Sequence, residues 1–205
     1  MVNADPTTEE KILSAARTVF HKRGFDGARM QEIADSAGIN KALLHYYFRS
    51  KENLFNAVFA EAISAMIGTI SSIFTGSGPL EEKLERFYDF HITFLQEHSY
   101  LPWFVINGLH EKPDEIKAFF SKKDFRPQQI LAQVVENLKK EGYEVEDPLQ
   151  MFANILSLSI FPIIAQPMLS HFFNLSEEDM DLFYEQRKRY LARFVINGLN
   201  LRKKE

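Results

Sequence analysis

A cluster of aromatic and basic side chains lies within the stretch GINKALLHYYFRSKENLF. His45, Tyr46 and Tyr47 are consecutive, and Arg49 and Lys51 follow them. Rings with polar tips pack poorly in an apolar core, and three in a row make an unusual surface toward water. Their hydroxyl and imidazole groups can donate to phosphate oxygens while the rings contact sugars. The cluster therefore favours a surface that contacts a nucleic-acid backbone.

The elements around this cluster are predicted to be two short helices joined by a tight turn. Asn40 is a good N-cap for a helix over residues 41–48, with Leu44 and Phe48 on its buried side. The preceding helix, over residues 30–37, ends at a glycine that can adopt the left-handed conformation of a sharp turn. This arrangement is typical of a helix-turn-helix unit.

Two further helices are predicted to flank this pair. Thr7 and Glu10 have the spacing of a capping box, and apolar residues at helical spacing continue from there until Gly24. On the other side, Ser50 is expected to cap a long amphipathic helix that reaches Phe74. The short helices would therefore rest on longer ones.

The composition is that of an ordinary globular protein. The chain has 205 residues, 45% of them apolar and 25% charged, which suffices for one large domain or two smaller ones. It has no cysteine, which excludes disulfides and thiolate metal sites and favours the reducing cytoplasm. The first residues lack the basic and apolar regions of a secretory signal. The longest nearly apolar run, residues 155–169, is shorter than the ~20 residues of a membrane span and contains two prolines. We expect a buried helix there and no membrane partner.

Charge is distributed unevenly along the chain. The net charge of −4 alone argues weakly against nucleic acid as a partner. Residues 1–55 carry eight Lys or Arg and seven Asp or Glu, a balance of +1, whereas residues 56–205 carry sixteen and twenty-one, a balance of −5. The acidic excess thus lies in the second part of the chain. The first part is nearly neutral, so its basic groups can attract a nucleic acid only through their local placement.

The rest of the chain also has the pattern of helices. Predicted helices cover residues 80–97, 113–120, 126–141, 148–168 and 176–198, with a break near Leu101–Pro102. No segment alternates with period two for long enough to predict a strand. We therefore expect an all-α fold of about nine helices, with a three-helix helix-turn-helix domain at residues 1–52 and a larger helical domain at residues 53–205.

The motif around the cluster resembles the TetR family of bacterial transcriptional regulators. That family has the pattern IA…AG(V/I)S, then a recognition helix ending in LYYHF or LYHYF, then KEEL. This chain has EIADSAGI, LHYYF and KENL at the corresponding places, and the match covers residues 8–57. The resemblance implies that the helix over residues 41–48 lies in the DNA major groove. Beyond this motif, only the length and the helical pattern agree.

The resemblance also implies which residues contact DNA. The first part of the recognition helix would read bases, while its aromatic end and the start of the next helix would bind phosphates. The expected DNA-binding residues are Arg29, Lys41, Ala42, Leu43, His45, Tyr46, Tyr47 and Lys51.

Three of these residues depart from the family pattern. Leu43 replaces a polar residue, and it either fills the core or contacts a thymine methyl group. His45 replaces a tyrosine, so it can serve a base instead of a phosphate. Arg29 replaces a Thr or Ser cap; it cannot cap, but it can contact a phosphate or lie unbound at the surface.

The residues that are expected to bind phosphates could also have simpler, structural roles. One of Tyr46 and Tyr47 could be half-buried behind the recognition helix. Lys51 could be an ordinary solvated lysine.

For the larger domain, the resemblance implies a cavity that binds a small effector. Fourteen of the nineteen phenylalanines lie beyond residue 60, and any one of them could instead fill the core. The expected lining residues are Tyr88, Phe94, Trp103, Phe104, Phe120, Phe125 and Phe161. This aromatic surplus predicts an apolar or amphipathic effector, and the balance of −5 favours a neutral or cationic one.

Neither a cofactor nor a metal is expected in this domain. His91, His98 and His110 lack the carboxylate or cysteine partners that would complete a metal site. No nucleophile–base pair and no glycine-rich phosphate loop indicates an enzyme.

Two apolar helices, predicted at residues 149–168 and 180–199, are too hydrophobic to be solvated alone. The resemblance implies that they pair with those of a second subunit, giving a homodimer that binds a palindromic operator on double-stranded DNA. We therefore expect a ligand-released repressor that acts in the cytoplasm. The alternatives are an architectural or scaffold protein without an effector, and an all-helical enzyme in which the N-terminal match is incidental.

Overall fold

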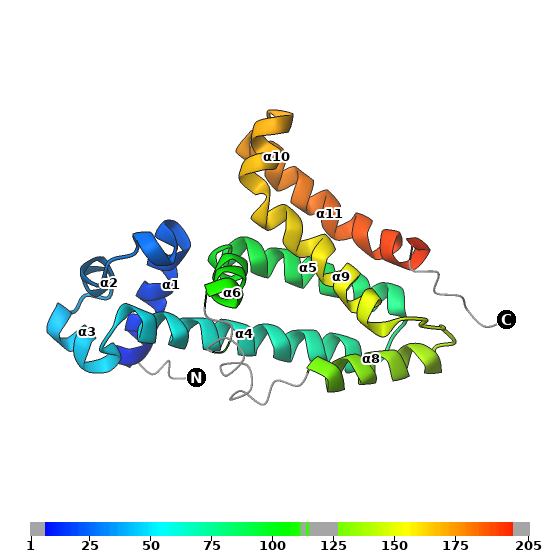
Figure 1. The fold of residues 1–205 in the computed structure, drawn as a ribbon, viewed down its shortest axis with the longest axis horizontal. Helices are drawn as coiled ribbons and strands as arrows, with labels where there is room; N and C mark the ends of the chain where they lie inside the picture. Colours follow the sequence, from blue (N-terminus) through cyan, green and yellow to red (C-terminus); the bar gives the residue numbers. More distant parts are fainter. Residues whose placement is uncertain (1–6, 112–113, 115–126, 199–205) are drawn as a thin grey trace, which may run out of the picture. The chain divides into compact units, whose positions relative to one another are not determined.

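Ten α-helices and no strand make up the residues that the structure, a computed structural model, describes, namely 7–111, 114 and 127–198. The all-α class predicted from the sequence is therefore confirmed. The chain divides into two compact units, Met1–Ala65 and Met66–Glu205. The division lies inside α4 (Lys51–Thr75), which is drawn in cyan in Figure 1. The domain boundary after residue 52 stays a prediction.

The first unit contains the predicted short helices. Its elements are α1 (Thr8–Gly27), α2 (Met30–Ser36), α3 (Lys41–Phe48) and the first half of α4. The capping box is complete, because the Thr7 hydroxyl accepts from the Glu10 N–H at 3.2 Å and the Glu10 carboxylate accepts from the Thr7 N–H at 2.7 Å. The helix is kinked at the predicted glycine, Gly24, whose φ of 66° is in the left-handed region.

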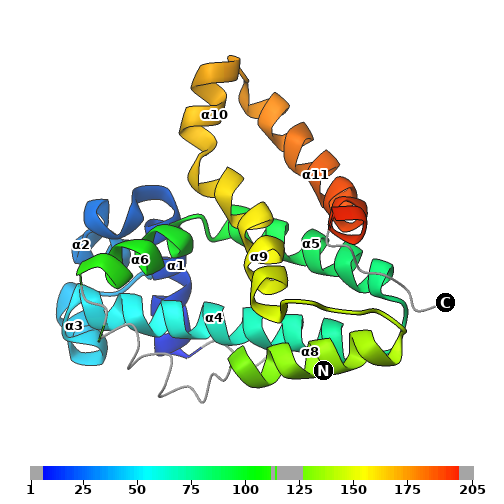
Figure 2. The same cartoon turned by 45° about the vertical axis from the view of Figure 1, so that its right-hand side comes forward.

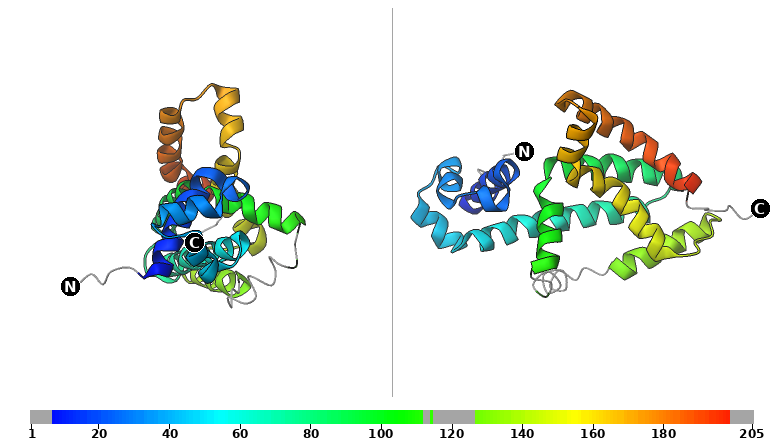
Figure 3. Two further views of the ribbon diagram at one scale, coloured as in Figure 1. Left: turned by 90° about the vertical axis from the view of Figure 1, so that its left-hand side faces the viewer. Right: turned by 45° about the horizontal axis from the view of Figure 1, so that its top comes forward.

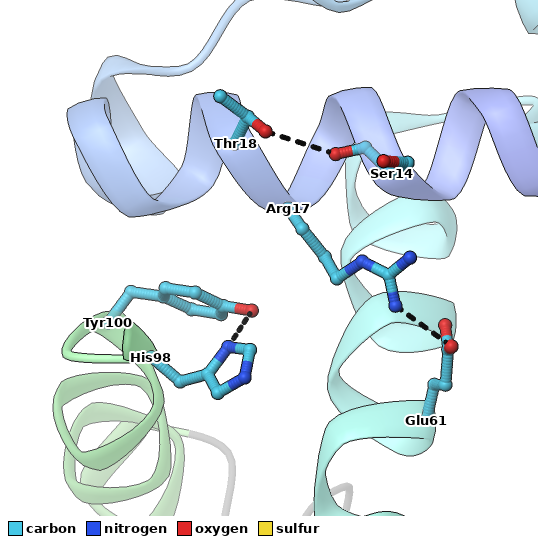
Figure 4. A network of polar contacts seen from close by, with 6 residues as sticks. All are labelled: Ser14, Arg17, Thr18, Glu61, His98 and Tyr100. Atoms are coloured by element: carbon cyan, nitrogen blue, oxygen red, sulfur yellow. Dashed lines mark hydrogen bonds and ion pairs between the residues drawn. The ribbon is translucent and has the colours of Figure 1, made fainter. Parts of the chain in front are cut away.

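Aromatic residues join α1 to α4 in this unit. Phe20 and Phe25 each meet the Phe55 ring edge to face, with centroids 4.8 and 5.0 Å away. At the surface, Arg17 on α1 donates to the Glu61 carboxylate on α4 at 2.9 Å (Figure 4). An exposed ion pair contributes little, so the buried rings account for most of the stability of this contact.

The second unit is arranged around one central helix. Its elements are α5 (Leu80–Glu97), α6 (Tyr100–Glu111), α8 (Pro127–Lys140), α9 (Pro148–Ile164), α10 (Gln166–Phe173) and α11 (Glu177–Gly198), together with the end of α4. The central helix, α5, packs against α9 and α11 and buries Leu84, Phe87, Tyr88 and Ile92. Figures 2 and 3 show α9 rising from the body of this unit, α10 at the tip and α11 running back antiparallel. We call these three helices the arm.

The predicted single apolar helix over residues 148–168 is wrong, because the structure divides it into α9 and α10. Their axes differ by 65° across Ala165. Pro167 lies in the first turn of α10, where a missing N–H costs nothing, and without that N–H it cannot continue the hydrogen bonds of α9. The extra element brings the described residues to ten helices, where about nine were expected for the whole chain.

Two other boundaries also bear on the sequence analysis. The break predicted near Leu101–Pro102 lies instead after Glu97, and Pro102 is in the first turn of α6. Proline is tolerated there because a helix start has N–H groups to spare. The helix predicted for residues 113–120 falls almost wholly outside the described residues.

Side chains of α11 hold the bent end of α9. Pro162 has no N–H, so the Leu158 carbonyl one turn earlier lacks its helical donor. Arg187 supplies two replacements, with its Nε and Nη2 at 3.0 and 2.7 Å from that oxygen. The Tyr184 hydroxyl donates to the Pro162 carbonyl at 3.0 Å. Polar side chains of a neighbouring helix therefore donate hydrogen bonds to the backbone carbonyls near the bend.

By length and composition alone, α4 could cross a membrane, and so could α9 and α10 if they formed one span. Core helices of soluble proteins pass the same test. Leu54, Phe55, Val58 and Phe59 of α4 are buried in the core of the first unit. Packing against the other helices of this unit explains the apolar character of that half of the helix.

Candidate nucleic-acid interface

The turn between α2 and α3 is fixed by backbone hydrogen bonds. Gly38 has a φ of 69°, and its N–H donates to the Asp35 carbonyl at 3.1 Å. The Ile39 N–H reaches back to the Ala34 carbonyl at 3.0 Å. This pair of bonds around a left-handed glycine is the Schellman ending of a helix. The sharp turn predicted at Gly38 is therefore confirmed.

The start of α3 is also capped as predicted. The Asn40 side-chain oxygen accepts from the Leu43 N–H at 2.8 Å. Leu44 and Phe48, four residues apart, are buried in the core of the first unit. Because these two side chains fix one side of the helix, the residues between them are turned outward.

The outward side of α3 carries the predicted base-reading residues. Lys41, Ala42 and His45 are exposed, and Leu43 is partly open to solvent as well. The leucine thus does not fill the core, and its contact with a thymine methyl group stays a prediction. Arg29 precedes α2 without capping it and is exposed.

Both tyrosines of the cluster are exposed. Tyr46 exposes 80% of its surface and Tyr47 39%, and their rings meet edge to face at 5.6 Å. Tyr46 is thus open to solvent, whereas most of the Tyr47 surface is covered, so the half-buried role stays open for Tyr47. Two phenol hydroxyls are therefore presented beside the start of α4.

A backbone carbonyl that sequence reasoning did not anticipate sets the hydrogen-bonding role of His45. Its Nδ1 lies 3.1 Å from the Arg49 carbonyl oxygen. A carbonyl only accepts, so Nδ1 carries the proton in this arrangement, and Nε2 of the neutral ring is then an acceptor. An acceptor suits the amino group of adenine or cytosine better than a phosphate oxygen.

The Lys51 side chain is partly covered, and its ammonium group already contacts other groups of the chain. Its Nζ lies 3.3 Å from both the Asp26 and the Ala28 carbonyl oxygens, and 4.6 Å from the centroid of the Phe25 ring. These contacts tie the start of α4 to the end of α1. An ammonium group has three donors, so a third remains for a phosphate.

The residues predicted to line an effector cavity lie on different helices of the second unit. Tyr88 and Phe94 on α5 are buried, and the Tyr88 hydroxyl donates to the Ile155 carbonyl at 3.3 Å. Burial raises the pKa of this hydroxyl and keeps it protonated. In this structure the Tyr88 side chain fills the core, and its hydroxyl already has a hydrogen-bond partner.

The other members of that set are less enclosed. Trp103 on α6 and Phe161 on α9 are 48% and 56% exposed, and Phe104 is partly exposed. Phe120 and Phe125 lie outside the described residues. The two exposed rings would line a pocket only if another segment or a second subunit covered them, so this set stays a prediction.

Comparisons with known proteins agree with the geometry of the first unit. Residues 12–58 match the family model for bacterial regulatory proteins of the tetR family. A protein described as a probable HTH-type transcriptional regulator, YttP of Bacillus subtilis (strain 168), is 24% identical over 199 residues, or 94% of this chain and 96% of YttP. The HTH-type transcriptional repressor BdcR of Escherichia coli (strain K12) is 30% identical over 102 residues, 49% of this chain and 52% of BdcR.

A solved structure extends the likeness to the whole fold. The TetR family transcriptional regulator PfmR from Thermus thermophilus superposes with a TM-score of 0.67 at 18% identity, over 92% of this chain and 98% of PfmR. The match at residues 12–58 and this likeness of fold confirm the resemblance to the TetR family drawn from the motif, for residues 12–58 by sequence and for the chain as a whole by fold.

Proposed function

We propose that the chain is a cytoplasmic repressor that binds a palindromic operator as a homodimer and leaves it when a small molecule binds. The observation that carries the DNA-binding proposal is the outward face of α3. Buried Leu44 and Phe48 anchor the helix, while exposed Lys41 and Tyr46 mark the two ends of the presented surface. A helix held in this way can enter a major groove without disturbing its own core.

The residues of this surface divide into two roles. Lys41, Ala42, Leu43 and His45 read base edges, with the leucine against a thymine methyl group and the histidine accepting from an amino group. Arg29, Tyr46, Tyr47 and Lys51 contact phosphates, with help from the N–H groups at the start of α4.

The homodimer is proposed to form through the arm. Large apolar side chains stand exposed there, among them Phe161, Met168, Leu182 and Phe194. A monomer would leave them in water, whereas an obligate interface buries such surface, typically over ~2,000 Å² in total. Two recognition helices related by a two-fold axis would then read two half-sites about one helical turn apart, ~34–36 Å.

The effector is proposed to be apolar or amphipathic, because the second unit is rich in aromatic residues. Tyr88, Phe94, Trp103, Phe104 and Phe161 are the described candidates for contact with it. BdcR, which matches 49% of the chain, is named a repressor, and this supports repression as the direction of control.

The phosphate assignments can be tested with two matched variants. Operator sequences are first selected from random duplexes, and affinity is then measured against salt for the selected and a random duplex. Tyr47→Phe removes one neutral hydroxyl and should weaken both duplexes alike without changing the salt slope. Lys51→Ala should weaken both and lower the slope by about one unit, since a cation releases about one counterion.

The stability of both variants is checked by thermal unfolding, because Lys51 also ties α4 to α1. Loss of affinity for the selected duplex alone would contradict the assignment to phosphate. If no duplex were enriched by the wild-type chain, the DNA-binding proposal itself would fail.

A further inference from the structure

His45 is held at the surface of α3 by contacts on one side of its ring. Leu44 and Phe48 are buried, which fixes the side of the helix that faces outward, and the His45 side chain is exposed there. Its Nδ1 lies 3.1 Å from the Arg49 carbonyl oxygen, one turn further along the chain. Within the described part of the chain, Nε2 has no hydrogen-bond partner. One ring nitrogen is thus held by the chain, and the other is left for a ligand.

The Arg49 carbonyl decides which ring nitrogen carries the proton. A backbone carbonyl only accepts, so Nδ1 donates to it whether the ring is neutral or charged. Nε2 then accepts a hydrogen bond when the ring is neutral and donates one when the ring is protonated. Uptake of one proton therefore reverses the hydrogen-bonding sense of Nε2 without requiring the ring to turn.

Bases in the major groove differ in the sense of the hydrogen bonds that they offer. Cytosine offers only the N4 amino donor, whereas guanine offers only the acceptors N7 and O6. Adenine offers both a donor and an acceptor, so it distinguishes the two states of an imidazole less sharply. An accepting Nε2 therefore favours cytosine over guanine, and a donating Nε2 favours guanine over cytosine.

The charged groups near His45 leave its ring without a salt bridge. Lys41 and Arg49 lie one turn either side of it on α3 and are exposed. Helix α2 packs against α3, and its Glu32 pairs with a basic side chain of α1 at 3.4 Å, while its Asp35 accepts from an amide of its own helix at 2.8 Å. The other charged side chains of α2 and of the first turn of α4, together with the residue that precedes α2, are Arg29, Lys51 and Glu52. No carboxylate of the described residues forms an ion pair with the ring, so DNA meets a histidine that is not already paired.

We propose that His45 determines which base the recognition helix accepts at one position of its binding site, namely cytosine with the neutral ring and guanine with the protonated ring. This rests on the DNA binding of the proposed function and specifies its base preference. The tyrosine that the family pattern has at this place would offer a hydroxyl that both donates and accepts, so its preference would not reverse. An imidazole in ordinary surroundings changes charge between about pH 5 and 8, so two pH values near these limits test the proposal.

The experiment selects binding sites for the full wild-type chain from random duplexes at about pH 5.5 and at about pH 8. One position should change from cytosine to guanine at the lower pH while the rest of the site is kept. Affinities are then measured for two duplexes that differ only by C·G or G·C at that position. Their ratio should change by at least about tenfold between the two pH values, because the favoured pair exchanges its hydrogen bond for two opposed donors or acceptors. The ratio is independent of the fraction of folded protein, which can also change with pH.

Two variants separate His45 from the other titrating groups of the chain. His45→Arg carries donors only, so it should favour guanine at both pH values. His45→Gln has an amide that donates and accepts but does not titrate, so its preference should be the same at both. A wild-type ratio that is independent of pH, or a change that persists in His45→Gln, overturns the inference. If the wild-type chain enriches no duplex at either pH, the DNA-binding proposal itself fails, so the two failures are distinguishable.

Discussion

At the scale of single residues, the second unit contains a histidine whose surroundings give it a measurable signature. His91 on α5 is buried, its ring stacks on Phe87 at 5.0 Å, and its Nδ1 lies 2.8 Å from the Ser159 hydroxyl oxygen. Ser159 also donates to the Leu156 carbonyl at 2.9 Å, so its oxygen is the acceptor for His91. The neutral imidazole thus donates its Nδ1–H to the Ser159 hydroxyl oxygen, and its buried surroundings disfavour a positive charge on the ring.

Burial lowers the pKa of His91 from 6.5 to about 4 in the folded chain. The unfolded chain takes up this proton below pH 6.5 and the folded chain only near pH 4, so protonation favours unfolding. We expect His91 to leave the free energy of unfolding unchanged above pH 6.5. Between pH 6.5 and 4, its protonation in the unfolded chain should lower this free energy by ~3 kcal/mol. His91→Gln keeps a donor without a titrating ring, and it should remove this part of the pH dependence.

The check is the free energy of unfolding in urea across that pH range, for the wild type and the variant. The relevant quantity is the difference between the two curves, because carboxylates titrate in both proteins. Two parallel curves would show that His91 becomes protonated in the fold without penalty.

At the scale of elements, some helix boundaries followed the caps and glycines of the sequence. Asn40 and Gly38 stand where they were expected to begin and end helices, whereas α1 continues past Gly24 to Gly27. Proline was the less reliable marker. Pro102 and Pro167 each occupy a first turn, where no N–H is required, and Pro162 lies inside α9. The position of a proline in its helix depends on tertiary packing, which a single sequence does not show.

The bend between α9 and α10 offers a test of such packing. Arg187 donates twice to the Leu158 carbonyl, which Pro162 leaves without a helical donor. Arg187→Leu should destabilise the chain by ~1–3 kcal/mol, because a partly buried carbonyl loses its partners. Pro162→Ala restores an N–H at that place and should make the loss of Arg187 less costly.

A double-mutant cycle in urea measures this coupling. The two changes together should cost less than the sum of the single changes by at least ~0.5 kcal/mol. Strict additivity would indicate that Arg187 stabilises the unit through contacts other than the Leu158 carbonyl.

At the scale of the whole molecule, the two units differ in how far the sequence determines them. In the first, caps, turn and motif residues agree, and α2, α3 and α4 begin where the pattern placed them. In the second, helices were predictable but their exposed faces were not. Phe172 and Phe173 at the tip of the arm are 71% and 68% exposed, whereas Phe87 is buried. Apolar periodicity does not distinguish a core side chain from one that awaits a ligand or a second subunit.

The coupling between ligand and operator is a property of the whole molecule. Helix α4 begins at Lys51, beside the proposed DNA surface, and ends at Thr75 in the second unit, a length of ~36 Å at 1.5 Å per residue. One helix thus runs through both units, and in the proposed homodimer a shift at its far end would alter the separation of the two recognition helices. A ligand that prefers the altered spacing must weaken DNA binding, and DNA must weaken the ligand by the same factor.

We therefore expect a true effector to lose about 5–150-fold in affinity when saturating operator is present, corresponding to ~1–3 kcal/mol of coupling. Compounds are screened by thermal shift on the full chain, starting with flat or amphipathic neutral and cationic molecules. Each hit is then titrated with and without the selected operator, and the operator is titrated with and without the hit. A random duplex at matched length and salt serves as the control, and equal factors in the two directions are required by linkage. A ligand that binds the second unit with equal affinity in both titrations would show that its site does not control DNA binding, and the architectural or scaffold role would then become the better description of the chain.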